Sequence, residues 1–271
     1  MPTSQMNAKV MNPNSLNLVQ VAVYDRLIDA PLNRAWENVL DWAHLPYLHE
    51  TTFDYAELQD AGDWGWRTWS NASHTDHIEL TVSDADSYVA RSYQSGQQVS
   101  EIWTTLIAQG DQTKVHVEFH FPDVDTEIVD TMGAAILSLY TKLWDEDEQM
   151  MRQRHTRLLE KRAEESETNL GSEADLLQHL KADGRLLFQL RRREYQLREV
   201  DGTLIAHSSI CPHRLGPLAD ADISTGKLRC PWHGYEFDLQ SGNCISPKDA
   251  DCHLAPAPEL CRVSGNIIAR L

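Results

Sequence analysis

Two short segments near the C-terminus carry a ligand pattern that restricts the fold more than any other feature of the chain. "CPHRLGPL" supplies Cys211 and His213, and "CPWHGYEFD" supplies Cys230 and His233. The pattern is C-x-H, sixteen residues (214–229), then C-x-x-H. Two thiolates and two imidazoles can hold zinc, but zinc fingers usually group the cysteines in one loop and the histidines in the other. Here each loop supplies one of each, as a [2Fe–2S] cluster requires when sulfur binds one iron and nitrogen the other.

The residues around these ligands fit the same cofactor. Pro212 and Pro231 stiffen the two loops, while Gly216 and Gly234 allow the backbone to approach a cluster closely. The two loops and the sequence around them, 174–271, resemble the Rieske family. By that resemblance the two cysteines bind one iron of a [2Fe–2S] cluster and the two histidines bind the other.

The resemblance also indicates the kind of Rieske centre. Respiratory-complex Rieske proteins have an extra cysteine in each loop, where this chain has Gly216 and Trp232. Those proteins also carry Ser and Tyr hydroxyls that donate to the cluster, where this chain has Tyr235 and Phe237. Fewer hydrogen bonds to the sulfurs favour the oxidised state, so we expect a potential near the low end of the family's range, roughly −150 mV.

The remaining cysteines and the overall charge limit the other possible functions. Cys244, Cys252 and Cys261 lack partners at ligand spacing, so we expect reduced, half-buried structural thiols. No run approaches the roughly 20 apolar residues that span a bilayer, and the first fifteen residues lack the apolar core of a signal peptide. A formal net charge of −17 disfavours nucleic acid and anionic membranes as partners. We therefore expect a cytoplasmic protein that binds neither.

The first half of the chain predicts one strand, one helix, an antiparallel sheet and a long helix, in that order. Alternation over 17–28 predicts the strand, and a helix over 31–43 follows Pro31, which suits a first helical position. Short segments of period two between 53 and 122 predict an antiparallel meander. A long helix is predicted over 126–163. This order resembles the helix-grip (START-like) fold, in which a curved sheet wraps around the last helix and leaves an apolar cavity.

The expected fold class is therefore α+β, with two domains. We predict a helix-grip domain over 1–165, a polar linker over 166–173 and a small all-β Rieske domain over 174–271. The Trp-rich segment "DWGWRTWS" (63–70) either lines the cavity of the first domain or fills its core.

The segment "WENVLDWAHLPYLHE" offers ligands for a second metal. Asp41 precedes His44 by three residues, and His49 follows five residues later. Pro46 is expected to break the helix, so that His49 folds back toward His44, while Asp41 lies where it can accept the second ring N–H of His44. Non-haem iron oxygenases use two histidines and one carboxylate, with open positions for oxygen and substrate.

The carboxylate is expected from the last helix, where "LWDEDEQMM" offers four acids in a row. Asp147 has apolar residues at i−4, i−3, i+3 and i+4, so it should face the interior. The flanks of Asp145 are polar, which predicts a solvated face. A buried carboxylate is costly unless a cation compensates it. We predict Asp147 as the third ligand, with Glu146 as the alternative.

Here the resemblance becomes more specific. "ENVLDWAHLPYLH" matches the E-N-x-x-D-x-x-H-x4-H segment of Rieske non-haem iron oxygenases, whose catalytic domain is itself a helix-grip fold. The match implies that His44 and His49 bind a mononuclear Fe(II) and that Asp41 links it to the Rieske histidines. The domain order is reversed, because family members normally place the Rieske domain first. In the family the cooperating centres usually lie on neighbouring subunits of a trimer, so a homotrimer is possible.

The resemblance implies an oxygenase that hydroxylates or demethylates an apolar or aromatic small molecule. It would use O2 and electrons from an NAD(P)H-dependent reductase or a ferredoxin, because the chain has no nucleotide fingerprint of its own. The main alternative is a Rieske ferredoxin-like electron carrier fused to a START-like ligand-binding domain. A cyclase-type START domain with an attached redox sensor is a third possibility. The three differ in whether His44, His49 and Asp147 converge.

Overall fold

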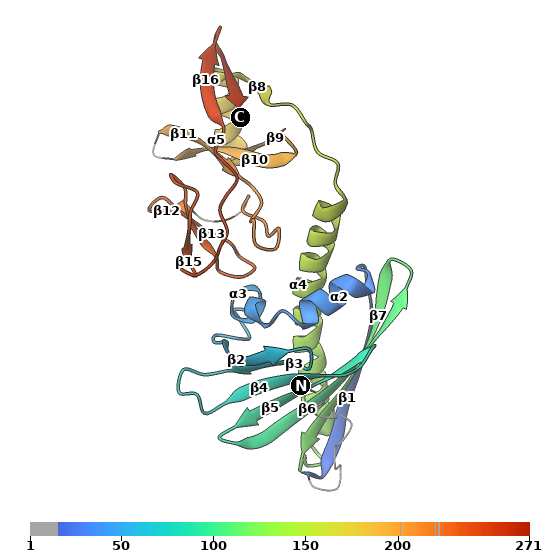
Figure 1. Ribbon diagram of the computed structural model, residues 1–271. Helices are drawn as coiled ribbons and strands as arrows, with labels where there is room; N and C mark the ends of the chain where they lie inside the picture. The colour runs from blue at the N-terminus through green and yellow to red at the C-terminus, as the bar shows by residue number, and fades with distance from the viewer. Residues whose placement is uncertain (1–15, 201, 220, 222) are drawn as a thin grey trace. The chain divides into compact units, whose positions relative to one another are not determined.

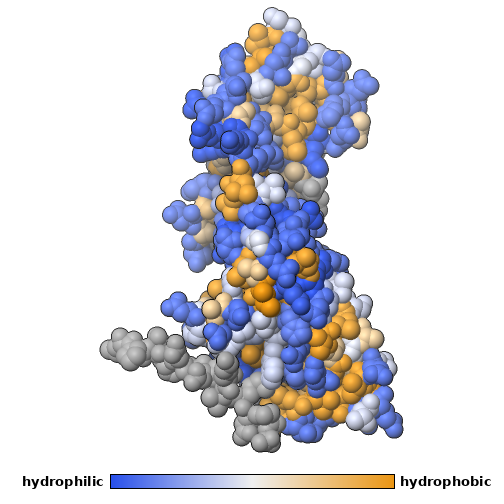
Figure 2. Space-filling view, turned by 90° about the vertical axis from the view of Figure 1, so that its right-hand side faces the viewer, coloured by the Kyte–Doolittle hydropathy of each residue, from blue (hydrophilic) through white to orange (hydrophobic). Residues whose placement is uncertain are grey.

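The computed structural model describes residues 16–200, 202–219, 221 and 223–271. It divides into two compact units, one ending at His155 and the other beginning at Thr156. The first fifteen residues, in which we expected no signal peptide, lie outside the described part. No helix in the described part is both long enough and apolar enough to cross a membrane. The face shown in Figure 2 carries hydrophilic side chains over much of its area, with hydrophobic side chains in patches among them.

The first unit is built on one antiparallel sheet with the strand order β1-β7-β6-β5-β4-β3-β2. The strands are β1 Leu18–Ile28, β2 Glu57–Gly62, β3 Gly65–Trp69, β4 His77–Asp84, β5 Ser87–Gln94, β6 Gln97–Gln109 and β7 Gln112–Pro122. Period-two patterning decides which face is covered: on β7, Val115, Val117 and Phe119 are buried. His116 and His120 alternate with them and therefore point to the opposite face of the sheet. The strand and meander expected from the sequence are both present.

The core of the first unit lies between this sheet and the long helix α4, Val129–Leu159. Figure 1 shows the strands curving past α4. Trp144 and Met151 of α4 belong to the same buried cluster as Leu80, Leu106 and the inward side chains of β7. The unit is therefore a curved sheet packed on one helix, a mixed arrangement of helix and antiparallel sheet.

The single helix expected over 31–43 ends early, and two further short helical segments continue beyond it. α2 runs from Leu32 to Val39, the 3-10 helix η1 from Trp42 to His44, and α3 from Leu45 to Leu48. Asp41 leaves helical geometry, with φ −98° and ψ 81°. Pro46 lies in the first turn of α3, where no N–H donor is needed, so it begins a helix rather than ending one.

The second unit holds three small antiparallel sheets, β11-β10-β9, β12-β13-β14-β15 and β16-β17-β8. Their strands are β8 Glu167–Ser172, β9 Leu186–Leu190, β10 Arg193–Val200, β11 Thr203–Ser208, β12 Ile223–Ser224, β13 Lys227–Arg229, β14 Glu236–Asp238, β15 Cys244–Ser246, β16 Glu259–Val263 and β17 Asn266–Arg270. The residues expected to form the linker, 166–173, contain β8, which pairs with β17. Its polar sequence lacks strand alternation, so the strand depends on a partner almost a hundred residues away.

One helix interrupts the expected all-β texture of this unit. α5 runs from Glu173 to Asp183, after Ser172, whose hydroxyl accepts a hydrogen bond from the backbone N–H of Asp175 at 3.2 Å. It ends at Gly184, which has φ 74°. Leu176 and Leu180, one turn apart, are buried against the sheets and hold the helix in place.

Candidate metal centres

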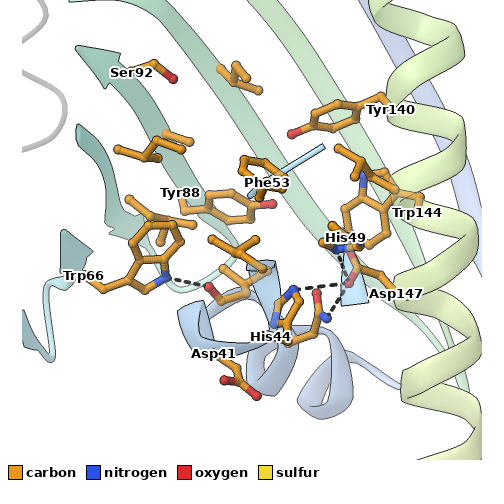
Figure 3. A pocket seen from close by; sticks show the side chains of 18 residues that line it. Asp41, His44, His49, Phe53, Trp66, Tyr88, Ser92, Tyr140, Trp144 and Asp147 are labelled. Atoms are coloured by element: carbon orange, nitrogen blue, oxygen red, sulfur yellow. Dashed lines mark hydrogen bonds and ion pairs between the residues drawn. The ribbon is translucent and has the colours of Figure 1, made fainter. Parts of the chain in front are cut away.

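The three side chains predicted to bind a mononuclear iron lie together in the first unit. His44, His49 and Asp147 each offer one ligand atom, and these atoms lie within 4.8 Å of one another. Oδ1 of Asp147 is 3.4 Å from Nε2 of His44 and 3.1 Å from Nε2 of His49 (Figure 3). Both histidines are buried, and the side chain of Asp147 is 13% exposed. Two imidazoles and one carboxylate are the donor set that non-haem Fe(II) sites use.

The broken helix explains how the two histidines meet. His44 ends η1, and His49 follows α3 as its C-terminal cap. The single turn between them brings their rings to a centroid separation of 5.2 Å, tilted by 73°. An uninterrupted helix would place these residues, five apart, on different faces. The change from 3-10 to α geometry after His44, and the non-helical conformation of His49 (φ −107°, ψ 35°), let both rings lie against Asp147.

Two further side chains hold the ligands in place. Nδ1 of His49 lies 2.6 Å from Oε2 of Glu146, so that His49 donates to this carboxylate and turns Nε2 toward Asp147. A metal-bound histidine almost always donates its other ring N–H in this way. The amide of Asn38 donates to Oδ1 of Asp147 at 2.8 Å. Glu146, the alternative ligand of the sequence analysis, thus contacts His49 rather than completing the triad, and the contribution of Asn38 was missed.

The electrostatics of the cluster favour a charged carboxylate beside protonated imidazole in the absence of metal. Burial by itself would raise the pKa of Asp147, but the His49 hydrogen bond, the charges of both histidines and the Asn38 amide lower it below its ordinary value. Burial would likewise lower the pKa of His49, but Asp147 and then Glu146 raise it above its ordinary value. A cation bound among these groups would replace the imidazole proton as the compensating charge.

A cavity of about 180 Å³ opens beside the three candidate ligands. Its walls are mainly apolar and come from the sheet, α2, α3 and α4, all within the first unit. Trp66, from the Trp-rich segment, and Trp144 both line it. The indole N–H of Trp66 donates to the carbonyl of Val39 at 2.9 Å. The other two tryptophans of that segment, Trp64 and Trp69, do not line the cavity. Of the three, only Trp66 therefore has the cavity-lining position that the sequence analysis considered.

Asp41 is found at the edge of the same cavity. In Figure 3 its carboxylate points away from His44, His49 and Asp147. It does not join the three ligand atoms. The hydrogen bond expected from the second ring N–H of His44 to Asp41 is not formed, because the carboxylate points away from that ring.

The second unit brings the two predicted cluster loops together. The loops turn in the same way: Leu215 N–H donates to the Cys211 carbonyl, and Gly234 N–H donates to the Cys230 carbonyl. Both cysteines are 1% exposed. The hydrogen bond between the thiols lowers the pKa of Cys230 and raises that of Cys211. The rings of His213 and His233 have centroids 4.7 Å apart.

The residues around these loops pack closely against the candidate ligands. A Cβ atom at Gly216 would lie 2.7 Å from the sulfur of Cys230, so only glycine permits this approach. Tyr235 stacks on His213 with ring centroids 4.1 Å apart. Phe237 is fully buried and has no hydroxyl to donate. The two thiols thus contact each other, and so do the two imidazoles, which fits the donor set of a [2Fe–2S] cluster with mixed ligands.

Other candidate side chains lie outside both centres. The three remaining cysteines are partly buried and free, as expected for structural thiols: Cys244, Cys252 and Cys261. His116 contacts Asp25, and His120 contacts Glu118, on the outer face of the sheet.

Comparison with known proteins supports the second centre. Residues 174–258 match the family model of the Rieske [2Fe-2S] domain. The oxygenase component of dicamba O-demethylase from Stenotrophomonas maltophilia is 48% identical over 48 residues, which cover 18% of this chain and 14% of that protein. The chloroplastic pheophorbide a oxygenase of Oryza sativa subsp. japonica is 33% identical over 84 residues, 28% of this chain and 16% of that protein. The chain therefore spans a small part of the curated relatives it matches.

Two solved structures match parts of the chain with low scores. The ferredoxin of carbazole 1,9a-dioxygenase from Nocardioides aromaticivorans IC177 gives a TM-score of 0.32 at 18% identity and covers 38% of this chain and 97% of its own. Ara h 8.0201 gives a TM-score of 0.41 at 14% identity, and the match covers 50% of this chain and 98% of that chain. Neither TM-score is high enough to establish a shared fold. The family match and the loop geometry together identify residues 174–258 as a Rieske [2Fe–2S] domain.

Proposed function

We propose that this chain is a Rieske-type non-haem iron oxygenase with reversed domain order. Its first unit, a helix-grip (START-like) domain, would hold a mononuclear Fe(II), and its second unit would supply electrons from the [2Fe–2S] cluster. The observation that carries the proposal is the convergence of His44, His49 and Asp147 beside an apolar cavity, in a chain that also has a Rieske domain. Neither centre alone would distinguish an oxygenase from other proteins.

The residues of the first unit fit the proposed metal. His44, His49 and Asp147 would bind Fe(II), which would provide the place where O2 is activated for hydroxylation or demethylation. Glu146 keeps the proton on Nδ1 of His49 and leaves Nε2 for the metal. Asn38 fixes the orientation of Asp147. The apolar walls would hold an apolar or aromatic small molecule and exclude water from the reaction.

The second unit fits the role of an electron source. Cys211 and Cys230 would bind one iron of the cluster, and His213 and His233 the other. An NAD(P)H-dependent reductase or a ferredoxin would reduce it. We propose Asp41 as the group that links the two centres, as the family resemblance implies. A homotrimer, in which cooperating centres belong to neighbouring chains, is part of the same proposal.

A non-catalytic electron carrier with a ligand-binding domain remains the second candidate. The observation that favours it is that both ring nitrogens of His49 already have carboxylate partners without metal. His49 has Glu146 on one ring nitrogen and Asp147 on the other. Such a network can persist as a structural feature of the cavity wall.

Reoxidation of the reduced cluster separates the two candidates. The full chain, reconstituted with iron and sulfide, is reduced anaerobically with dithionite, freed of excess reductant and mixed with air-saturated buffer. Visible absorbance follows the cluster in the presence of a panel of small aromatic ethers, amides and acids. For an oxygenase, at least one compound accelerates reoxidation in the natural chain and in an Asp145→Asn control, but not in His44→Ala/His49→Ala. Equal rates in all three proteins would indicate an electron carrier.

A further inference from the structure

The cavity beside the candidate ligands has charged side chains on one side only. Asp41, His44, His49 and Asp147 lie at that side. The described residues that form the rest of the lining are apolar or neutral, and none of the described lining residues is Lys or Arg. An aromatic carboxylate bound there would lose its hydration without gaining a Lys or Arg partner. Both ring nitrogens of His49 are already paired with Glu146 and Asp147, so the charge of this imidazole is compensated, and Asp147 would repel the ligand. The lining therefore favours a neutral ligand.

Two tyrosine hydroxyls, together with the hydroxyl of Ser92 and the amide of Asn38, are polar groups of the neutral part. Tyr140 lies on the same stripe of α4 as Trp144 and Asp147, at i, i+4 and i+7, and Tyr88 comes from β5. In Figure 3 both hydroxyls point into the cavity. A hydroxyl in this position can donate to an oxygen of a ligand that is otherwise surrounded by apolar side chains.

Packing fixes the direction of both rings. Tyr140 meets Phe119 edge to face with centroids 4.6 Å apart, and Tyr88 meets Trp36 at 6.1 Å. Burial raises the pKa of Tyr88 to about 12 and that of Tyr140 well above its ordinary value. Both hydroxyls therefore keep their protons at neutral pH and act as donors rather than as anions.

The size of the cavity limits the ligand. An apolar protein cavity of about 150 Å³ binds benzene. The cavity here, about 180 Å³, has room for one ring with small substituents. Its mixture of indole, phenol and aliphatic walls suits a flat aromatic compound.

We propose that this cavity binds a neutral, single-ring aromatic compound whose ether or carbonyl oxygen accepts hydrogen bonds from Tyr88 and Tyr140, and that it rejects aromatic carboxylates. That this compound is the substrate rests on the proposed oxygenase function. Binding itself does not, because the tyrosines are separate from the metal ligands.

Two probes of nearly the same shape test the charge preference. 4-Methoxybenzamide is neutral and 4-methoxybenzoate is an anion at neutral pH. Isothermal titration of the full chain with each is expected to show the amide binding at least about 10-fold more tightly, because a buried carboxylate without a cation is costly. Equal or tighter binding of the benzoate, or no binding of the amide, would overturn the proposal.

Two variants test the tyrosines. Tyr140→Phe and Tyr88→Phe are each expected to weaken amide binding about 3- to 30-fold, since each removes one hydrogen bond to a buried oxygen. Tyr24→Phe is the matched control, because its ring contacts Tyr140 while its hydroxyl accepts from Arg26 outside the cavity lining. Unchanged affinity in both cavity variants, with circular dichroism showing native folding, would assign the hydroxyls no role.

These titrations, combined with a count of iron per chain, separate failure of this inference from failure of the proposed function. If the chain binds the amide through Tyr88 and Tyr140 but holds no mononuclear iron, the inference about the cavity stands and the proposed oxygenase function is wrong. If the chain holds the iron but binds the benzoate more tightly, the proposed oxygenase function stands and the inference about the cavity is wrong.

Discussion

Nδ1 of His49 lies 2.6 Å from a carboxylate oxygen of Glu146, on the helix that also carries Asp147. Oδ1 of the adjacent Asp147 lies 3.1 Å from Nε2 of the same ring. Two neighbouring acids on α4 thus contact the two nitrogens of one imidazole. The arrangement fixes the tautomer of His49 once a metal replaces the proton on Nε2. It is the most specific reason to regard this cluster as more than a buried ion pair.

Replacing Glu146 by Gln should weaken Fe(II) binding about 10- to 100-fold, since the charged acceptor of the His49 N–H is lost. Metal titration of the full chain with its [2Fe–2S] cluster in place measures the change. Asp145→Asn on the same helix is the control, because Asp145 is 61% exposed and forms only a surface pair with Arg26. Equal Fe(II) affinity in the two variants would show that Glu146 does not support metal binding.

The buried His207 should make the second unit less stable in acid. Burial lowers its pKa from 6.5 to about 4, and its Nε2 faces the amide nitrogen of Gln196 at 3.1 Å, where a second proton would have no acceptor. Between these pH values the unfolded chain binds a proton at His207 that the folded chain does not. The contribution of His207 to stability is therefore fully present above pH 6.5 and is lost as the pH falls toward 4. The loss is on the order of 3 kcal/mol.

Hydrogen exchange in peptides of β10 and β11, corrected for the intrinsic pH dependence, measures this loss. His207→Gln should show a flatter dependence of protection on pH across the same interval. A natural chain whose protection does not change over that interval would show that His207 is protonated in the folded state.

Phe119 should be among the most stabilising side chains of the first unit. It is 1% exposed and meets Tyr140 edge to face. Phe119→Ala should lower the free energy of unfolding by about 3–5 kcal/mol, because it leaves a cavity between the sheet and α4. Urea denaturation followed by tryptophan fluorescence tests this. Ile107→Ala, at a side chain 46% exposed on the neighbouring β6, should change stability by less than about 0.5 kcal/mol.

The potential of the cluster should lie near the low end of the Rieske range, roughly −150 mV. Phe237 is fully buried and has no hydroxyl, and Tyr235 is stacked on His213. Fewer hydroxyls can therefore donate to the cluster than in respiratory proteins, where such hydrogen bonds raise the potential. A redox titration followed by visible absorbance measures the midpoint. A clearly positive value would mean that other donors reach the cluster sulfurs.

The main elements and the convergence of the candidate ligands could be predicted from sequence because local patterns specify them. The spacing of Cys211, His213, Cys230 and His233 identified the cluster loops, and the apolar flanks of Asp147 identified which of four neighbouring acids turns inward. Both inferences rest on periodicity and on the preferences of metal ligands.

The features that sequence did not predict depend on contacts between distant segments. Glu146 reaches His49 only because the chain turns through α3, which cannot be read from the helix that carries Glu146. The expected linker forms β8 because β17 supplies a pairing partner. Pro46 was expected to end a helix, but a proline is equally suited to a first turn, and only the tertiary structure decides between the two.

Counting iron tests the central claim most directly. Total iron and the Rieske EPR signal are measured on anaerobically purified full-length protein, for the natural sequence and for His44→Ala/His49→Ala. The account predicts about three irons per chain in the natural protein and about two in the variant, with the Rieske signal unchanged. About two irons in both proteins would contradict the mononuclear site and leave an electron carrier with a ligand-binding domain.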